Sequence, residues 1–334
     1  MDAQERSTEV SRLMVLSEFA LIKKYFQNLT DDDSSVQCGI GDDAAVIQIP
    51  HNMEIVLSTD TLLEETHFPA DTLPSDIAYK ALAVNLSDMA AMGAVPKWVL
   101  LSISLPESDE VWLEQFASGF LELAKQHSLN LIGGDTSRGP LSITIQIQGL
   151  VPTGKALKRN GAQQGDLIYV SGTLGDAGVG LDIIQQKLVI ADEYKKFFIT
   201  CLNRPEISID AGLHLRDVAS SAIDISDGLI SDLGHILEAS HVGAEIEMEK
   251  IPLSEEMQQC INKMVAWNYA LTSGDDYKLC FTAPVEQHDL IFNTFEGINI
   301  PVSCIGKVSG EKGLRCKDPE GTYFEPTGSS YTHF

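Results

Sequence analysis

The sequence predicts a two-domain protein of mixed α/β class, with helices and strands in both halves. Three observations carry this prediction. The chain has 334 residues, which is more than a single domain usually holds. Segments with helical and with strand-like apolar spacing follow one another along its whole length. A turn at Pro152-Thr153-Gly154 separates two such blocks, so we place an N-terminal domain over residues 1–152 and a C-terminal domain over residues 153–334.

The elements of the first half follow from apolar periodicity and from turn residues. Ser17 is the expected N-cap of an amphipathic helix, and Asp31–Ser35 is typical of a polar turn. A strong helical pattern ends at Gly93, with Pro96 soon after. We therefore expect helices at Ser17–Leu29, Asp76–Met92 and Glu110–His127, and strands at Val46–Ile49, Glu54–Asp60, Trp98–Leu105, Asn130–Gly133 and Leu141–Val151.

The second half repeats this mixture. A glycine-rich stretch, Gly172–Gly180, follows a strand and leads into a helix that runs to about Leu188. Its glycines suit a phosphate-binding loop and a tight strand-to-helix turn equally well. Further helices are expected at Asp192–Leu202, Ser208–Asp217 and Leu229–Ala239, and strands at Asp166–Ser171, Ala222–Ile225, Ala244–Glu247, Tyr277–Thr282 and Pro301–Val308.

The charge balance is strongly acidic, with 48 Asp and Glu against 23 Lys and Arg and a net charge of −25. Such a chain should be repelled by nucleic acid phosphates and by anionic membrane surfaces, so we expect neither as a partner. It could hold divalent cations, or its charge could serve solubility alone. No run of about 18 apolar residues is present, so no membrane helix is expected.

The N-terminus and the cysteines indicate a cytoplasmic protein. Residues Met1–Val10 are charged and contain no apolar signal-peptide core. None of the six cysteines forms a C-x-x-C pair, and no histidine lies at zinc-finger spacing from them. Dispersed cysteines of this kind are typical of reduced thiols in a cytosolic protein.

Six short motifs place an aspartate beside glycine, serine or threonine. They are Gly39–Asp43, Ser58–Asp60, Asn85–Asp88, Gly133–Thr136, Asp224–Gly228 and Ser273–Asp276. Short carboxylates next to hydroxyl groups suit Mg²⁺, which takes oxygen ligands and shares them with substrate phosphates. Neighbouring glycines let backbone amides approach phosphate oxygens. We expect each aspartate at the end of a strand or helix, where α/β folds place ligands.

Each motif alone also has a simpler explanation. An aspartate next to glycine or serine is more often a turn residue or a helix cap than a metal ligand. Asp227 could cap the helix that begins at Leu229, and Asp42-Asp43 could make a turn. Six such motifs are harder to explain in this way. Together they make a magnesium site plausible, although the sequence has no G-x-x-x-x-G-K-[ST] loop and no H-R-D or D-F-G set.

Taken in order, these motifs resemble the thiamine-monophosphate kinase family over nearly the whole chain, from Ser17 to Tyr331. The most specific runs are Gly39–Val46, Ser58–Phe68, Ala81–Gly93, Gly133–Pro140, Ala222–Leu237 and Ser273–Thr282. The resemblance implies a two-domain fold like that of aminoimidazole-ribonucleotide synthetase, with an α/β N-terminal domain that forms a homodimer and an α+β C-terminal domain. It also implies transfer of the ATP γ-phosphate to thiamine phosphate, which gives thiamine diphosphate, the product of this biosynthesis.

The resemblance further assigns roles to individual residues. The expected ligands of several Mg²⁺ ions, direct or through water, are Asp43, Ser58, Thr59, Asp60, Asp88, Asp135, Asp224 and Asp227. The expected ATP contacts are Gly134, Asp135, Arg159 and Ser226, and the expected thiamine phosphate contacts are His67, Asp275 and Tyr331. The family commonly has Glu where this chain has Asp275, so the carboxylate here is one methylene shorter. It often has an acid at the position of Lys278.

No general base is expected among these residues. The acceptor would be a phosphate monoester, which is largely ionised at pH 7 because its second pKa is about 6. Direct in-line transfer is therefore the expected mechanism, with positioning and charge neutralisation as the main requirements. Two alternatives remain open: a sister enzyme of the same superfamily that acts on an aminoimidazole precursor or on selenide, and a non-catalytic acidic metal-binding protein. Cys38 lacks the glycine-rich context expected of a selenide enzyme.

Overall fold

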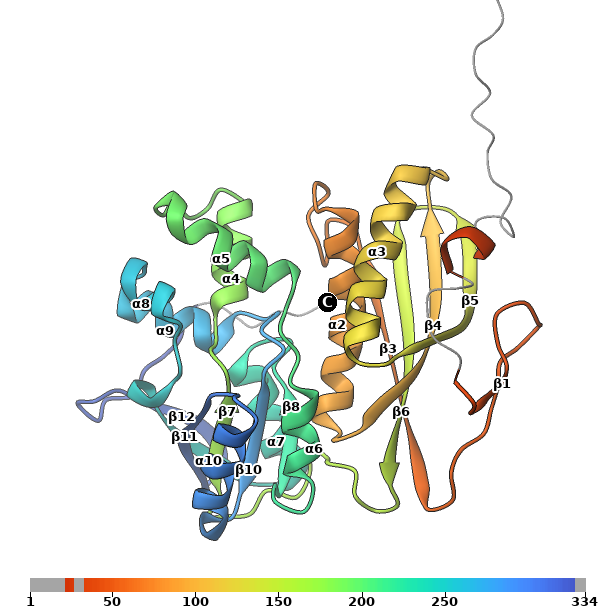
Figure 1. The fold of residues 1–334 in the computed structure, drawn as a ribbon. Helices are drawn as coiled ribbons and strands as arrows, with labels where there is room; N and C mark the ends of the chain where they lie inside the picture. Colours follow the sequence, from red (N-terminus) through yellow and green to blue (C-terminus); the bar gives the residue numbers. More distant parts are fainter. Residues whose placement is uncertain (1–21, 27–32, 328–334) are drawn as a thin grey trace, which may run out of the picture.

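The computed structural model describes residues 22–26 and 33–327, which form two large sheets with helices packed against them (Figure 1) and a third sheet of only two short strands. The four-stranded sheet belongs to the first half of the chain and the six-stranded sheet to the second half. The last strand of the first sheet ends at Pro152, and the first strand of the second sheet begins at Leu167. The predicted two-domain architecture of mixed α/β and α+β type is therefore confirmed. The exact boundary at 152/153 stays a prediction.

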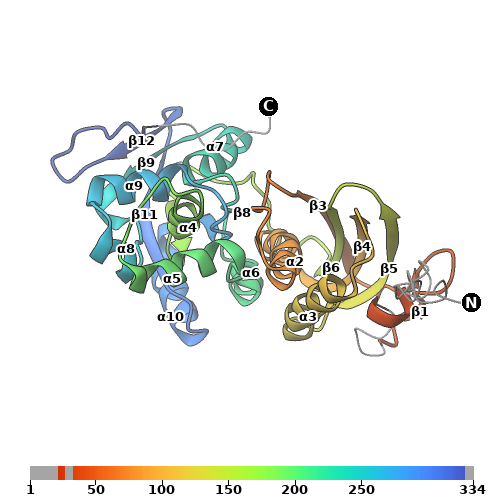
Figure 2. The ribbon, with the colours of Figure 1, turned by 90° about the horizontal axis from the view of Figure 1, so that it is seen from above.

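The first sheet has the strand order β3-β6-β4-β5, and only β4 and β5 run parallel. Its strands are β3 (Met53–Leu63), β4 (Val95–Leu105), β5 (Asn130–Arg138) and β6 (Ser142–Pro152). Two helices cover one face (Figure 2), namely α2 (Pro74–Ala91) and α3 (Glu110–Gln126). Asp109 caps α3 by accepting hydrogen bonds from two backbone amides. Gly119 lets the two helices touch, since a Cβ there would lie 2.0 Å from the Ser75 carbonyl oxygen.

The described part of the chain before β3 packs partly on α3, through Lys24 and Tyr25, and partly on the sheet around Trp98. It contains the π-helical turn η1 (Ile22–Phe26) and the strands β1 (Val36–Cys38) and β2 (Val46–Ile47). The predicted turn at Asp31–Ser35 is seen from Asp33 onward, and residues 31 and 32 lie outside the described residues. Asp33 also accepts hydrogen bonds from Trp98 Nε1 at 3.2 Å and from Asn130 Nδ2 at 3.3 Å. This carboxylate therefore anchors the segment to the sheet as well as making the turn.

The second sheet has the order β12-β9-β11-β7-β10-β8, and only β12 and β9 run parallel. Its strands are β7 (Leu167–Ser171), β8 (Ser221–Asp224), β9 (Gly243–Glu247), β10 (Leu279–Ala283), β11 (Val302–Ser309) and β12 (Gly313–Lys317). The helices of this half are α4 (Asp176–Ile184), α5 (Asp192–Asn203), α6 (Ile209–Leu215), α7 (Leu229–Ser240), α8 (Glu255–Cys260), α9 (Lys263–Thr272) and α10 (His288–Gly297), with short 3-10 turns η2 (Met248–Lys250) and η3 (Val285–Gln287).

Helix α2 joins the two halves (Figure 2). It packs on α3 and the first sheet on one side and on α6 and β8 on the other, which explains why it is apolar nearly all round. A Cβ at Gly212 of α6 would lie 2.0 Å from the Ala90 carbonyl oxygen, so the helices are in direct backbone contact. Arg204 at the end of α5 forms ion pairs with Asp76 of α2 at 2.6 Å and with Glu122 of α3 at 2.9 Å.

Several predicted elements differ from the structure. The helix predicted at Ser17–Leu29 lies mostly outside the described residues, which contain only its η1 portion. The strand predicted from Tyr277 begins at Leu279, because Asp275 and Tyr277 have φ of 67° and 50°, which a strand does not allow. The predictions missed β1, β12, α8, α9 and α10, none of which is longer than ten residues.

Candidate active site

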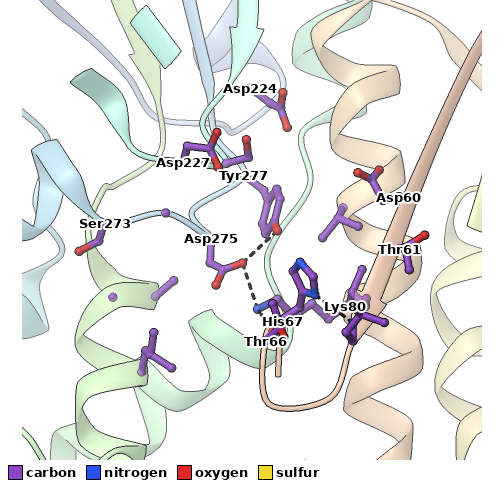
Figure 3. Close-up of a pocket in the computed structure, with 18 of the residues that line it drawn as sticks. Asp60, Thr61, Thr66, His67, Lys80, Asp224, Asp227, Ser273, Asp275 and Tyr277 are labelled. Atoms are coloured by element: carbon purple, nitrogen blue, oxygen red, sulfur yellow. Dashed lines mark hydrogen bonds and ion pairs between the residues drawn. The ribbon is translucent and has the colours of Figure 1, made fainter. Parts of the chain in front are cut away.

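A cavity of about 850 Å³ lies between the two halves of the chain (Figure 3). One wall is formed by β3, the loop that follows it and α2. The other wall is formed by the start of α4, the end of α9 and the two loops that carry Asp224–Asp227 and Ser273–Tyr277. Segments more than 200 positions apart in the sequence thus face one another across this space.

Three aspartates from both halves gather at one end of this cavity. Asp60 lies on β3, Asp88 on α2 and Asp224 at the end of β8. Ser58 donates a short hydrogen bond to Asp88, and Ser87 donates to Asp224 Oδ2 at 2.7 Å. Oδ2 of Asp60 is buried and has no hydrogen-bond partner in the described structure. Figure 3 shows Asp60 on one wall and Asp224 on the other.

Burial and mutual repulsion favour the protonated form of these carboxyl groups. Burial, reinforced by the charges of Asp88 and Asp224, raises the pKa of Asp60 to about 7. Burial and the charge of Asp88 raise the pKa of Asp224 to about 7. Burial also raises the pKa of Asp88, although the hydrogen bond from Ser58 opposes the shift. A divalent cation bound beside such carboxyl groups would strongly favour their ionised form over the protonated form.

The oxygen donors at this end of the cavity suit Mg²⁺ better than they suit a metal ion that is held by protein side chains alone. In the part of the chain that the structure describes, no three His, Cys, Asp or Glu side chains converge closely enough to hold a metal ion by themselves. Mg²⁺ needs no such cage, since it usually keeps waters and shares one or two carboxylates with substrate phosphates. The oxygen donors and the unpaired Asp60 Oδ2 match that requirement.

The raised pKa values predict a distinctive pH dependence of stability. A carboxyl group whose folded pKa is raised to about 7 stabilises the fold fully below its unfolded pKa near 4, and this contribution is lost as the pH rises toward 7. Without metal, we therefore expect the Tm to fall between pH 5 and pH 8, and Mg²⁺ to raise it more at pH 8. Thermal unfolding in EDTA and in Mg²⁺ measures this. An equally steep fall in Asp224→Asn would contradict the assignment of the effect to this cluster.

The loop after β8 is held in place by a buried acid on α7. Oδ2 of Asp232 accepts hydrogen bonds from the backbone amides of Asp227 at 3.0 Å and Gly228 at 3.1 Å. Burial raises the pKa of Asp232 to about 6, and these backbone hydrogen bonds oppose that shift. Gly228 has a φ of 116°, which a residue with a side chain rarely adopts. The loop thus presents Ser226 and Asp227 at the cavity wall.

A second group of polar side chains lies at the other end of the cavity (Figure 3). Lys80 of α2 forms an ion pair with Asp275 Oδ1 at 3.0 Å and donates to the His67 carbonyl oxygen at 3.2 Å. The hydroxyl group of Tyr277 donates to the same Asp275 oxygen at 2.9 Å. The ring Nδ1 of His67 accepts a hydrogen bond from the backbone amide of Leu63 at 2.9 Å, so the neutral ring carries its proton on Nε2.

The remaining predicted residues fall into a second cavity or outside both. Asp43, Gly134 and Asp135 line a cavity of about 1150 Å³ on the first sheet. Arg159 is exposed, and its charge only weakly opposes the burial that raises the pKa of Asp88. Tyr331 lies outside the described residues. A single chain therefore brings most of the predicted ligands together in two places. The cavity between the halves is lined by Thr59, Asp60, His67, Asp224, Ser226, Asp227 and Asp275, and the cavity on the sheet by Asp43, Gly134 and Asp135. Ser58 and Asp88, which are hydrogen-bonded to each other, line neither cavity.

The expectation that each aspartate ends a strand or helix is wrong for two of them. Asp60 lies inside β3, where it is paired with Ile145, and Asp135 lies inside β5, where it is paired with Ser102. The strands continue because their partner strands β6 and β4 extend equally far. Asp224 does end β8, and Asp88 lies in the last turn of α2.

Sequence reasoning did not assign Ser87, Asp232 and Tyr277 at this site, and it also missed Lys80. A partial signal existed for Lys80, because it interrupts the otherwise apolar run from Ala78 to Val84, and a charged residue in such a run is rarely buried unless it is paired. Asp232 is an acid in the first turn of a helix, a common position that does not by itself indicate a site. Ser87 and Tyr277 lie within the recognised runs Asn85–Asp88 and Ser273–Thr282, but neither was given a role there.

Comparison with known proteins defines the class of this fold and site. The family model described as AIR synthase related protein, N-terminal domain, matches residues 41–151, and the model for the C-terminal domain matches residues 163–318. Solved structures of the hydrogenase maturation protein HypE, including one in complex with ATP, share the fold at 19% sequence identity and a TM-score of 0.71. The chain is therefore a two-domain protein of the AIR synthase-related class. No helix among the described residues is long and apolar enough to cross a membrane.

More similar proteins narrow this class to one family. Thiamine-monophosphate kinase of Salmonella typhimurium is 45% identical over 96% of this chain and 99% of its own length, and that of Haemophilus influenzae is 47% identical over 96% and 99%. The crystal structure of thiamine-monophosphate kinase from Stenotrophomonas maltophilia matches with a TM-score of 0.84 and 43% identity, over 90% of this chain and 96% of that one. This chain belongs to the thiamine-monophosphate kinase family and is a kinase. The resemblance read from the motifs is confirmed.

Proposed function

We propose that this enzyme transfers the γ-phosphate of ATP to thiamine phosphate, which yields thiamine diphosphate and ADP. The observation that carries the proposal is the cavity between the halves, which has carboxylates at one end and Lys80, His67 and Asp275 at the other. A relative that is 33% identical, AaThiL, has been solved complexed with AMPPCP and TMP, with a TM-score of 0.75 over 97% of this chain. That complex supports the presence of both substrates in the same kind of fold.

We propose that the two ends of the cavity receive different parts of the reaction. Asp60, Asp88, Asp224 and Asp227, with Ser58 and Thr59, would hold Mg²⁺ ions that neutralise the phosphate charges. Ser226 and Arg159 would contact ATP, and His67 and Asp275 would bind thiamine phosphate, together with Tyr331. Because the acceptor phosphate is already ionised near neutral pH, this chain needs to supply no general base. Its residues orient the acceptor oxygen for direct in-line transfer without a phosphoenzyme.

The second cavity supports a homodimer. Asp43, Gly134 and Asp135, proposed metal and ATP contacts, lie away from the cavity between the halves, on the face of the first sheet opposite α2 and α3. That face of the described chain also carries Leu57, which is 58% exposed, and Ile55, which is 37% exposed. We propose that a second copy covers this apolar face and encloses the loop at Asp43. All six cysteines are free thiols, which supports a reducing, cytoplasmic location.

A coupled assay of ADP release tests the proposed reaction. With ATP and Mg²⁺ present, we expect ADP to form only when thiamine phosphate is added, and thiamine diphosphate to accumulate in equal amount. ADP release that needs an aminoimidazole precursor or selenide would favour a sister enzyme of the superfamily. Magnesium binding with no ADP release under any of these conditions would overturn the proposal in favour of a metal-binding protein.

A further inference from the structure

Lys80 is a buried cation at the junction of the two halves. Its side chain is only 4% exposed, although it projects from α2 in the N-terminal half toward a loop of the C-terminal half. A buried ammonium group is costly unless it is paired and hydrogen-bonded. Here the ion pair with Asp275 and the hydrogen bond to the His67 carbonyl oxygen meet that need. The lysine thus contacts both residues that the proposed function assigns to the acceptor within the described structure.

The loop that carries Asp275 needs external support. Asp275 and Tyr277 both have positive φ, which costs free energy for residues with side chains and persists only where the surroundings enforce it. Backbone hydrogen bonds link Asp275 to the Ser226 carbonyl oxygen at 2.9 Å and Tyr277 to that of Ile225 at 2.8 Å. The loop therefore connects the two groups of site residues, and Lys80 is its tie to the opposite wall.

The charge of the cavity also depends on Lys80. Five aspartates line the cavity in the described chain, against two residues with basic side chains, Lys80 and His67. Lys80 and Tyr277 both bind Oδ1 of Asp275, so the other oxygen is not required to hold the side chain in place. Removing the ammonium group would break the tie between this loop and the opposite wall and leave Asp275 repelled by its acidic neighbours.

We propose that Lys80 is a positioning residue for the acceptor substrate. Its ammonium group holds the loop 273–277 of one half against the loop 63–67 of the other and so fixes Asp275 and His67 in the arrangement that binds thiamine phosphate. This inference rests on the proposed function. It predicts that Lys80 affects the binding of thiamine phosphate and not the binding of ATP.

Steady-state kinetics with each substrate varied in turn test this role. In Lys80→Met we expect the KM for thiamine phosphate to rise at least about tenfold and the KM for ATP to stay within about twofold, because only the acceptor side loses its support. Tyr277→Phe removes the other donor to Asp275 and should raise the same KM about threefold. Lys155→Met removes an exposed ion pair with Asp217 and serves as the matched control, with unchanged kinetics.

A double-mutant cycle separates positioning from a general structural role. In the Asp275→Asn background, Lys80→Met should change the KM for thiamine phosphate by less than about threefold, since the partner through which it acts is already altered. The inference would be overturned if Lys80→Met raised the KM for thiamine phosphate as much in the Asp275→Asn background as in the wild type. It would also be overturned if Lys80→Met alone raised the KM values for both substrates equally, or left the KM for thiamine phosphate unchanged. If Lys80→Met does not fold, Tyr277→Phe decides by the same criterion. A wild-type enzyme that does not phosphorylate thiamine phosphate would overturn the proposed function itself.

Discussion

Asp60→Asn is expected to lower turnover by at least about a hundredfold, in line with the loss of a preorganised electrostatic group. Asp60 lies inside β3, and its buried Oδ2 has no hydrogen-bond partner in the described structure, so it is free to bind a cation. The amide keeps the size of the side chain and removes the charge. Initial rates at saturating ATP and thiamine phosphate, over a range of Mg²⁺ concentrations, measure the effect.

The same substitution should not weaken the fold. Burial and the charges of Asp88 and Asp224 disfavour the ionised form of Asp60, so its removal should raise the Tm of the metal-free protein at pH 8 by a few degrees. Asp289→Asn, at an exposed position on α10, is the matched control for both measurements. Near-normal turnover in Asp60→Asn would rule out its assignment as a metal ligand. A lowered Tm would show that the lost activity reflects damage to the fold.

Gly274→Ala is expected to lower kcat/KM by at least about a hundredfold, because a displacement of about 1 Å at a reacting site can cost that much. A Cβ at Gly274 would lie 2.2 Å from the Ser226 carbonyl oxygen, a contact that only a shift of one of the two loops can relieve. Either shift would move Asp275 away from Ser226 and Asp227. Kinetics for both substrates and a thermal unfolding curve measure the outcome.

Gly234→Ala provides the control for this substitution. Gly234 lies on α7, and no atom lies within 4 Å of a Cβ built on it. Alanine favours a helix over glycine by about 1 kcal/mol, so this variant should keep its activity and an equal or higher Tm. Gly274→Ala with wild-type kinetics would show that the close packing of the two loops does not matter for the reaction.

The sequence alone determined the class of the protein and most of its elements. Helix α2 has a long apolar stretch with a clear end signal at Gly93, and α3 has strong apolar periodicity, so their bounds were predicted to within two residues. The motifs around Asp60, Asp88, Asp224 and Asp275 could be recognised because each consists of small and acidic residues that are neighbours in the sequence. The family and its activity class followed from the order of these motifs.

Only the tertiary structure decided which of these residues share a site. The packing of α2 against both halves brings Lys80 to Asp275, and Ser87 to Asp224, across 195 and 137 positions of sequence. Strand pairing extends β3 and β5 past Asp60 and Asp135, and a positive φ at Tyr277 delays the start of β10. Local patterns cannot carry such information, because long-range pairing and the burial of a charge depend on residues far apart in the chain.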